Sequence, residues 1–355
     1  MQQKPFYPEK RVFIISAGSV VGQKEKKGPL GALFDFSGDD RFGKDTWEKS
    51  EAEMQRLALG IALRKAELMD YEIDLLFAGD LINQCLSSAF GLMGYRVPYL
   101  GLFGACSTCA EGLLLASASV SAMCRRAAVV TSSHFCSAER QFRYPVEYGG
   151  QRPPTAQWTV TGAGAFILSS SPRDAVRCGS EYVPEITELM PGCLVDRGIT
   201  DAANMGAAMA PAAADTIRRY LDSGADSSSA LFVTGDLGAE GSAILHDLLR
   251  ADGIELEARH TDCGLRVYDR TESDAHAGGS GCGCSATVLA AELLEKLRLG
   301  QMPDIVFLAT GAFMNALAVN QGQSIPGIAH LIRIQAAKRC DLIEEKGGVP
   351  DGADR

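Results

Sequence analysis

The sequence predicts an α/β protein made of two similar halves, because two combinations of helix and strand each occur twice in the same order. An apolar run that ends in Gly-Asp-Leu occupies residues 75–81, and a similar run occupies residues 230–237. A stretch with apolar residues at helical spacing precedes each run, over residues 51–68 and 209–221. Strands that are joined through helices favour mainly parallel sheets in a layered α/β arrangement.

The second repeated combination opens with Cys-Ser and contains an apolar helix followed by an apolar strand. It covers residues 106–131 and returns over residues 284–309. Since both combinations recur in the same order, we interpret them as an internal duplication. The two halves are predicted to cover residues 1–175 and 176–334. Residues 335–355 are rich in charged side chains, so we expect a disordered tail there.

The composition is ordinary for a globular protein and argues against nucleic-acid binding. The 355 residues are 46% hydrophobic and 22% charged, which is enough apolar material for a large core. The formal net charge of -10 provides no basic surplus to neutralise phosphates. No apolar run reaches the roughly 20 residues that a membrane span needs, and the first ten residues contain no signal-peptide core. We therefore expect a cytosolic or membrane-peripheral protein.

The eleven cysteines are interpreted as reduced thiols rather than as disulfides or zinc ligands. Cys106 and Cys109 have the CxxC spacing of a zinc or redox site. Cys282 and Cys284 have only one residue between them, which is a poor match for a second zinc knuckle. We expect neither a metal nor a cofactor.

Cys106 follows a glycine-rich turn and stands at the start of a predicted apolar helix. Backbone N–H groups and the positive end of a helix lower the pKa of a thiol, so this context predicts a nucleophile or a grip for an anionic ligand. Free cysteine is also among the most buried residue types, and a small core residue is the alternative interpretation.

Several motifs resemble those of thiolases and β-ketoacyl synthases. Residues 104–108, Gly-Ala-Cys-Ser-Thr, are similar to the nucleophile turn of these enzymes, and residues 160–168 are similar to their glycine-rich strand signature. Within this thiolase-like superfamily, residues 138–145, 156–165 and 276–285 resemble the stage V sporulation protein AD family of spore-forming bacteria. The resemblance extends over about residues 10 to 334.

The resemblance implies a thiolase-like fold and a homodimer. It implies binding of dipicolinic acid (pyridine-2,6-dicarboxylate), free or as its calcium chelate, for uptake into the developing spore. It further implies integral-membrane partners of the same sporulation channel, and a peripheral position on the cytoplasmic face of the inner forespore or spore membrane.

The histidines that condensing enzymes of the superfamily use are missing from their expected places. These enzymes need two histidines, or a histidine and an asparagine, to polarise a carbonyl and to manage a proton. Residues 233–237 read Val-Thr-Gly-Asp-Leu where the first histidine is expected, and residues 281–285 contain no asparagine. We therefore predict a noncatalytic protein. The alternative is a cysteine-dependent acyltransferase or condensing enzyme with Cys106 as nucleophile and His276 as acid or base, and a purely structural subunit is a third possibility.

Dipicolinate is a flat dianion, so its site must supply N–H donors or cations together with apolar walls. Phe142, Tyr144 or Trp158 could provide a wall. For the arginines a solvated loop or a dimer contact is the alternative, and for the histidines a structural hydrogen bond. The predicted ligand-binding residues are Cys106, Ser107, His134, Arg140, Arg143, His276 and Gly279.

Overall fold

The computed structural model describes residues 4–142 and 153–346, and it contains one large mixed sheet with helices on both sides. Ten of its strands form two sets of five with the same order, and one short extra strand pairs with the first strand. In the first half the order is β1 (Val12–Val21), β7 (Gly162–Ser169), β5 (Arg126–Ser133), β3 (Leu75–Gly79) and β4 (Tyr99–Gly101). In the second half it is β8 (Tyr182–Met190), β13 (Gly327–Lys338), β12 (Asp304–Ala312), β9 (Leu231–Thr234) and β10 (His260–Asp262).

The two sets also agree in strand direction. The first three strands of each set pair antiparallel. The outer three strands of each set pair parallel, in the order β5, β3, β4 in the first half and β12, β9, β10 in the second. A short antiparallel contact between β1 and β8 joins the sets into one sheet. The remaining strands are β2 (Phe36–Ser37), beside β1, and a separate pair of β6 (Trp158–Thr159) and β11 (Gly279–Ser280).

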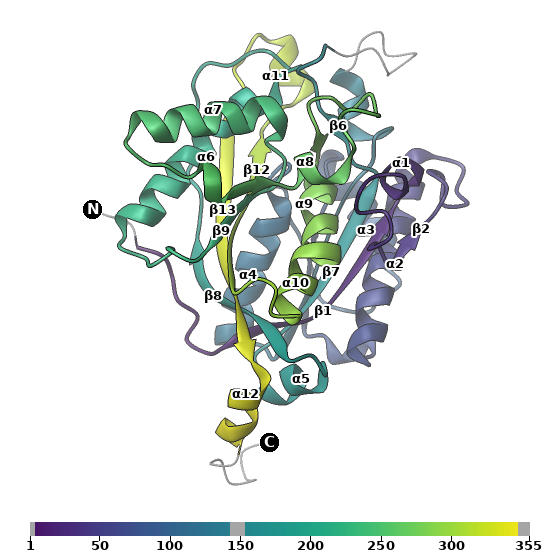
Figure 1. Cartoon of the computed structure of the whole chain (residues 1–355). Helices are drawn as coiled ribbons and strands as arrows, with labels where there is room; N and C mark the ends of the chain where they lie inside the picture. The colour runs from purple at the N-terminus through teal and green to yellow at the C-terminus, as the bar shows by residue number, and fades with distance from the viewer. Residues whose placement is uncertain (1–3, 143–152, 347–355) are drawn as a thin grey trace.

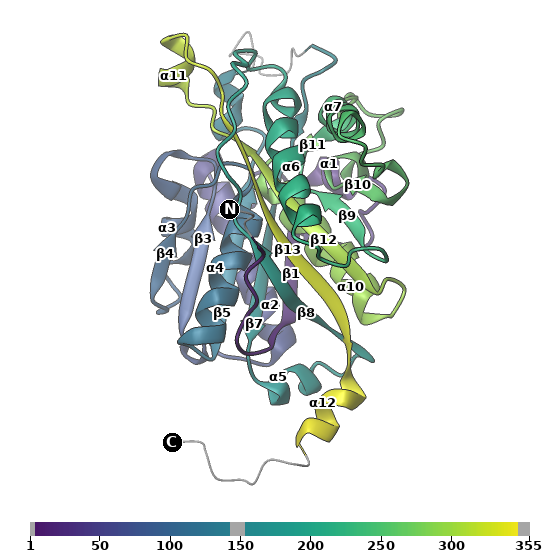
Figure 2. The ribbon, with the colours of Figure 1, turned by 90° about the vertical axis from the view of Figure 1, so that its left-hand side faces the viewer.

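Helices occupy three layers around the strands (Figures 1 and 2). Helix α2 (Trp47–Ala66) covers β1, β7 and β5, and α3 (Leu86–Leu92) packs on α2. Helix α4 (Thr108–Ala122) contacts β5 of the first half and β12 and β13 of the second, so it lies between the two sets of strands. On the far side α6 (Met205–Asp222) covers β12 and β13, and α7 (Gly238–Ala251) packs on α6.

The other helices are short. A second central helix consists of α9 (Cys282–Val288), the π-helical turn η5 (Leu289–Leu293) and α10 (Leu294–Arg298). The others are α1 (Gln23–Lys26), η1 (Asp70–Glu72), η2 (Asn83–Cys85), η3 (Ala138–Phe142), α5 (Pro172–Arg177), η4 (Glu257–Arg259), α8 (Gly264–Val267), α11 (Ala316–Asn320) and α12 (Arg339–Lys346).

The buried apolar side chains form three clusters that match this layering. One cluster lies between the two sets of strands and contains the central helices, with Leu113 and Leu293 among its members. A second joins α2 to the first-half strands, for example through Met54. The third joins α6 and α7 to the second-half strands, for example through Met209 and Leu245. Burial on both faces explains why the strands are nearly continuous apolar runs rather than alternating ones.

The expected repeat of helix and strand is present, with two differences from the sequence analysis. The middle of the sheet is antiparallel, and the parallel pairs lie toward its two ends. Regular structure also continues past residue 335, where we expected disorder, because β13 pairs with β8 as far as Lys338 and α12 follows. The division at residues 175 and 176 stays a prediction.

One helical window, over residues 105–122, has the length and hydropathy that would allow a membrane span. Of this window 67% is buried inside the protein, as expected for a helix between two layers of strands.

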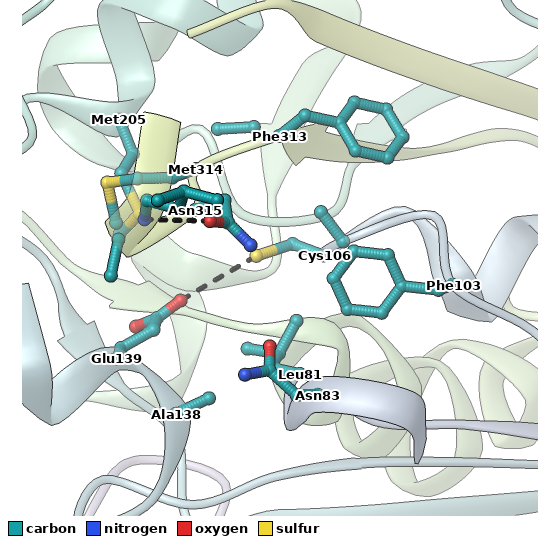
Figure 3. Close-up of a pocket in the computed structure, with 14 residues that line it drawn as sticks. Leu81, Asn83, Phe103, Cys106, Ala138, Glu139, Met205, Phe313, Met314 and Asn315 are labelled. Atoms are coloured by element: carbon teal, nitrogen blue, oxygen red, sulfur yellow. Dashed lines mark hydrogen bonds between the residues drawn. The ribbon is translucent and has the colours of Figure 1, made fainter. Parts of the chain in front are cut away.

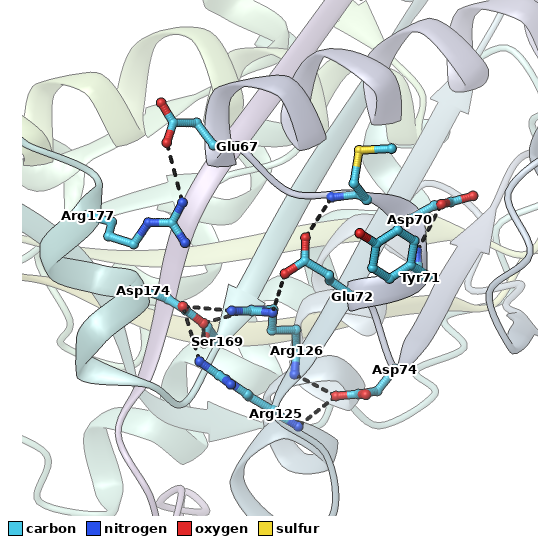
Figure 4. A network of polar contacts seen from close by, with 11 residues as sticks. Glu67, Asp70, Tyr71, Glu72, Asp74, Arg125, Arg126, Ser169, Asp174 and Arg177 are labelled. Carbon is cyan, nitrogen blue, oxygen red and sulfur yellow. Dashed lines mark hydrogen bonds and ion pairs between the residues drawn. The ribbon is translucent and has the colours of Figure 1, made fainter. Parts of the chain in front are cut away.

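A network of ion pairs joins the beginning of β5 to neighbouring turns at the end of the sheet opposite the cavity described below (Figure 4). The guanidinium group of Arg126 donates two hydrogen bonds of 2.8 Å to the carboxylate of Asp174 on α5. Its third nitrogen contacts Glu72 of η1 at 3.4 Å. Since Arg126 and Asp174 are both buried, each depends on the other for compensation of its charge.

Candidate functional site

Cys106 follows a backbone turn that requires an unusual conformation of the residue before it. Ala105 has a φ of 51°, in the left-handed region that residues other than glycine rarely adopt. Two side chains stabilise this turn: the Ser107 hydroxyl donates to the Gly104 carbonyl at 2.6 Å, and the Thr108 hydroxyl donates to the Ala105 carbonyl at 2.6 Å. Strain of this kind persists only where the surroundings fix the conformation, and it commonly marks functional sites.

The Cys106 side chain lines a cavity of about 470 Å³. Figure 3 shows Cys106 in the middle of the cavity, with Phe103 and Phe313 on one side of the view and Glu139 on the other. The two phenyl rings are 6.4 Å apart between centroids and are tilted by 53°. The other lining residues are mostly apolar; they are Leu81, Asn83, Ala105, Ala138, Met205, Ala312, Met314, Asn315, Ala316 and Leu317.

Two carboxyl groups lie beside the thiol. Glu139 Oε1 is 3.8 Å from Cys106 Sγ, and its Oε2 accepts hydrogen bonds from Thr159 and Ser280. Burial, followed by the negative charges of Asp236 and Glu139, raises the pKa of the Cys106 thiol well above its ordinary value. The prediction that the helix start lowers this pKa is therefore wrong, because desolvation and carboxylates outweigh the helix end.

Asp236 occupies the place where the sequence analysis noted a missing histidine. Its carboxyl group accepts hydrogen bonds from the Gly281 N–H at 2.9 Å and from the Thr310 hydroxyl at 2.8 Å. Burial raises the pKa of Asp236 to about 8, although both hydrogen bonds lower it. Burial therefore favours the protonated form of this carboxyl group, and the protonated form cannot accept the proton of a thiol.

A second turn with a positive φ precedes a buried cysteine in the other half. Gly281 has a φ of 98° and precedes Cys282, just as Ala105 precedes Cys106. The pKa of Cys282 is also raised well above normal, first by burial and then by acidic groups that include Asp80. The negative charge of a Gly-Asp-Leu aspartate of the opposite half thus raises the pKa of each thiol, Asp236 for Cys106 and Asp80 for Cys282.

Neither histidine that we considered for the site lines the cavity. His134 is buried; one ring nitrogen lies 2.8 Å from the Asp40 carbonyl, and the other accepts the Cys136 N–H at 3.0 Å. These two bonds require the neutral ring, and burial lowers the pKa of His134. His276 is exposed, with its Nδ1 3.3 Å from the Arg270 carbonyl. The possible proton-transfer role of His276 at Cys106 therefore has no geometric support.

The remaining predicted ligand residues that the structure describes, Ser107, Gly279 and Arg140, do not line the cavity. The N–H group of Ser107 donates to the Gly104 carbonyl at 3.1 Å, so the helix start does not present it to a ligand. Gly279 is buried in β11, and its carbonyl accepts a 2.7 Å hydrogen bond from Gln157. Arg140 follows Glu139 on η3. Arg143, Tyr144 and the side chain of Phe142 lie outside the described residues.

Most of the lining residues were missed in the sequence analysis. Asn83 comes shortly after the Gly-Asp-Leu end of β3, and residues 313–317 follow β12 directly. Their common signal is position: both segments come after the carboxyl ends of strands, where ligands bind in α/β proteins. Glu139 carried no such signal.

Buried carboxyl groups should make the stability of the protein fall as the pH rises. The pKa is raised to about 7 for Glu25, to about 6 for Asp262 and to about 8 for Asp236. These values lie above those of the unfolded chain, near 4, so the folded state binds more protons and its advantage disappears as pH rises through the folded values. We expect thermal unfolding to occur at a lower temperature at pH 8 than at pH 6.

The substitution Asp236→Asn should remove roughly 2 kcal/mol of that pH dependence. Asp226→Asn is the matched control, because Asp226 is exposed and its pKa is lowered, so it does not titrate in this range. Unfolding temperatures measured from pH 6 to pH 8 by calorimetry check this. Parallel curves for the unmodified protein and Asp236→Asn would contradict it.

Comparison with known proteins agrees with this fold. The family model described as Stage V sporulation protein AD (SpoVAD) matches residues 3–335. Stage V sporulation protein AD of Bacillus subtilis (strain 168) is 43% identical over 334 residues, covering 93% of this chain and 96% of that protein.

Two solved structures are similar in fold at low identity. The 3-oxoacyl-[acyl-carrier-protein] synthase III of Aquifex aeolicus VF5 has a TM-score of 0.53 and 15% identity, covering 91% of this chain and 99% of that chain. The acetamide-bound OleA of Xanthomonas campestris has a TM-score of 0.56 and 13% identity, with coverage of 91% and 99%. The fold is thus thiolase-like, and the chain belongs to the stage V sporulation protein AD family.

Proposed function

We propose that this sporulation protein binds dipicolinic acid for its uptake into the developing spore and performs no catalysis of its own. The observation that carries the noncatalytic part is the setting of Cys106. The thiol is 3% exposed, has a raised pKa and faces Asp236 and Glu139. No histidine is among the described residues that line the cavity. A thiol whose pKa is raised in this way is not ionised at neutral pH, and no imidazole among the described lining residues can take its proton, so it fits a binding site better than a nucleophile.

The size and walls of the cavity support a small flat ligand. A volume of about 470 Å³ lies within the range of small-molecule sites. Phe103 and Phe313 offer aromatic faces to a pyridine ring. The Asn315 amide oxygen accepts the Leu317 N–H at 2.8 Å, so its NH2 group is directed to other acceptors, such as a ligand carboxylate. Asn83 offers a second amide.

The charge of the cavity favours the calcium chelate over the free dianion. Among the described lining residues there is no lysine or arginine, whereas Glu139 carries a carboxylate. A dianion would meet a negative field, but a one-to-one calcium chelate of dipicolinate is neutral. The chelated calcium also keeps open coordination positions for oxygen ligands.

The alternative function is acyl transfer with Cys106 as the nucleophile, which the fold of the similar synthase makes worth testing. It would require a base other than His276, whose ring is exposed and bonded to the Arg270 carbonyl. A stable acyl group on Cys106 after incubation with acyl-CoA, detected by mass spectrometry, would favour this alternative.

Calorimetric titration tests the binding proposal. We expect the calcium chelate to bind more tightly than free dipicolinate, which is titrated in calcium-free buffer. Phe313→Ala should weaken binding about two- to tenfold through loss of an aromatic contact. Phe36→Ala is the control, since this exposed ring packs on Phe42 and does not line the cavity. No heat of binding at millimolar concentrations of either form would contradict the proposal.

We also propose that the protein forms a homodimer through the edge of the first half. The sheet order ends at β4, and the backbone groups on its outer edge can pair with a second copy. The apolar side chains that are exposed there are too many to be incidental. They are Leu86, Phe90, Met93, Tyr99, Leu100 and Phe103.

The substitution Leu100→Asp should convert the dimer to a monomer, because it places a charge on the pairing strand. Leu299→Asp is the control, because it introduces the same charge at an exposed leucine away from β4. Sedimentation velocity distinguishes the two states. A monomer for the unmodified protein, or a dimer that survives Leu100→Asp, would rule out this interface.

The proposal includes integral-membrane partners and a peripheral position on the cytoplasmic face of the inner forespore or spore membrane. It rests on membership of the sporulation family. Recovery of the protein from spore membranes together with integral-membrane proteins would support it, and recovery from the soluble fraction alone would oppose it.

A further inference from the structure

Four polar side chains form a continuous hydrogen-bonded chain in the second half of the protein. His246 Nε2, on α7, lies 2.9 Å from His260 Nδ1 on β10. His260 Nε2 lies 2.9 Å from the Thr234 hydroxyl at the end of β9, and this hydroxyl lies 2.7 Å from Asp262 Oδ2. Asp262 and Thr234 are fully buried, whereas His260 and His246 are partly exposed. The chain therefore leads from a buried carboxyl group toward solvent.

Every member of this chain can both donate and accept a proton, so its bonds can point either way. With Asp262 ionised, the Thr234 hydroxyl donates to it and accepts the Nε2–H of His260, whose Nδ1 then accepts the Nε2–H of His246. With Asp262 protonated at Oδ2, all three bonds reverse, and His260 carries its proton on Nδ1. The tautomer of His260 therefore reports the protonation state of Asp262.

Burial sets the protonation states of the inner members. Burial, and then the charge of His246, lowers the pKa of His260 to about 3, so this ring stays neutral and passes a proton only by exchanging one N–H for the other. Burial raises the pKa of Asp262 to about 6, although the N–H groups of Leu237 and Gly238 donate to it at 2.8 Å and 3.0 Å. Asp262 thus titrates at mildly acidic pH while it is shut off from solvent.

The charged groups on the surrounding elements have partners of their own. Arg259 of η4 donates to the Ser227 carbonyl before β9. The described ion pairs join α7 to η4, α6 to the end of α7, and α8 to η5. They are Arg250 with Asp247 and Glu257, Arg218 with Asp252, and Arg266 with Glu292.

Asp262 connects the chain to Asp236, the carboxyl group beside Cys106. The two N–H donors of Asp262 belong to the residues that directly follow Asp236. Burial raises the pKa of Asp236 to about 8, and the charge of Asp262 adds to this effect. The neighbouring thiols of Cys263 and Cys284 stay neutral, because burial raises their pKa well above its ordinary value. A proton on Asp262 therefore weakens the negative field at Asp236.

We propose that His246, His260, Thr234 and Asp262 form a proton relay, which carries protons between solvent and the buried Asp262 and so couples its charge to the pH outside. In the inward direction, His246 Nδ1 takes a proton from water, and its Nε2–H passes to His260 Nδ1. The His260 Nε2–H passes to the Thr234 oxygen, and the Thr234 O–H passes to Asp262 Oδ2. Each intermediate member gives one proton and receives one, so the chain gains a single proton, at Asp262.

Nitrogen-15 NMR of the histidine rings in the full chain tests the relay, because the two neutral tautomers have different ring-nitrogen shifts. We expect His260 to change from the Nε2–H form at about pH 8 to the Nδ1–H form at about pH 5, as Asp262 takes up its proton. His330 is the internal reference. Its Nδ1 accepts the Gly192 N–H at 3.1 Å and burial lowers its pKa to about 4, so it keeps the Nε2–H form.

Asp262→Asn and Thr234→Val should each abolish the change of tautomer, the first by removing the ionisable end and the second by removing the hydroxyl that links this end to His260. Thr216→Val is the matched control, because Thr216 is also a buried threonine and its hydroxyl donates to the Ala329 carbonyl outside the chain. It should leave the change intact. If one of the two variants unfolds, the other decides the result.

Two outcomes would overturn the relay. One is a His260 ring that keeps a single tautomer over the whole pH range in the unmodified protein, and the other is a change of tautomer that persists in either folded variant. The four residues of the chain do not line the cavity at Cys106, so failure here leaves the dipicolinate proposal standing.

Discussion

The burial of the Cys106 thiol beside carboxyl groups is the constraint on which the account of this protein depends. The duplicated topology produces it. Helix α4 lies between the two sets of strands, and the turn at Ala105 directs its first residues toward the end of β9. Asp236 stands at that end, and Glu139 approaches from η3. In this dry and acidic setting a thiolate is strongly disfavoured.

The turn that resembles the nucleophile turn of enzymes of this fold here lines a cavity, for which we propose a binding role. The strained turn, the cavity and the aromatic walls remain, whereas no described imidazole reaches the sulfur. The scaffold is shared with a synthase, and a shared fold leaves the chemistry to a few side chains at the ends of strands. An amide pair and two phenyl rings suit recognition of a flat ligand better than acyl transfer.

The sequence predicted the scaffold better than the site. Repeated Gly-Asp-Leu runs and repeated Cys-Ser helices were sufficient to predict the duplication, because apolar periodicity and turn residues are local signals. The antiparallel middle of the sheet was not predictable from them, since strands β7 and β13 pair with partners far away in the chain. For the site, Cys106 was found from its glycine-rich context. Glu139, Phe313 and Asn315 reach it only through tertiary structure.

The pKa of Cys106 was predicted in the wrong direction for a physical reason. A helix start favours a thiolate when the sulfur is partly hydrated, but desolvation dominates when the sulfur is buried. The carboxyl groups of Asp236 and Glu25 follow the same rule, since burial favours their neutral form and raises their pKa. The thiol and the two carboxyl groups are thus all held toward their neutral forms by burial.

The most direct test of the central claim is the pH dependence of alkylation at Cys106, followed by mass spectrometry of the peptide. The exposed Cys193 in the same sample serves as the internal reference. The account predicts that the Cys106 rate is still rising above about pH 9, beyond the ordinary thiol pKa of about 8.5. A rate that reaches its plateau below about pH 7 would reveal an activated thiolate and would contradict the account.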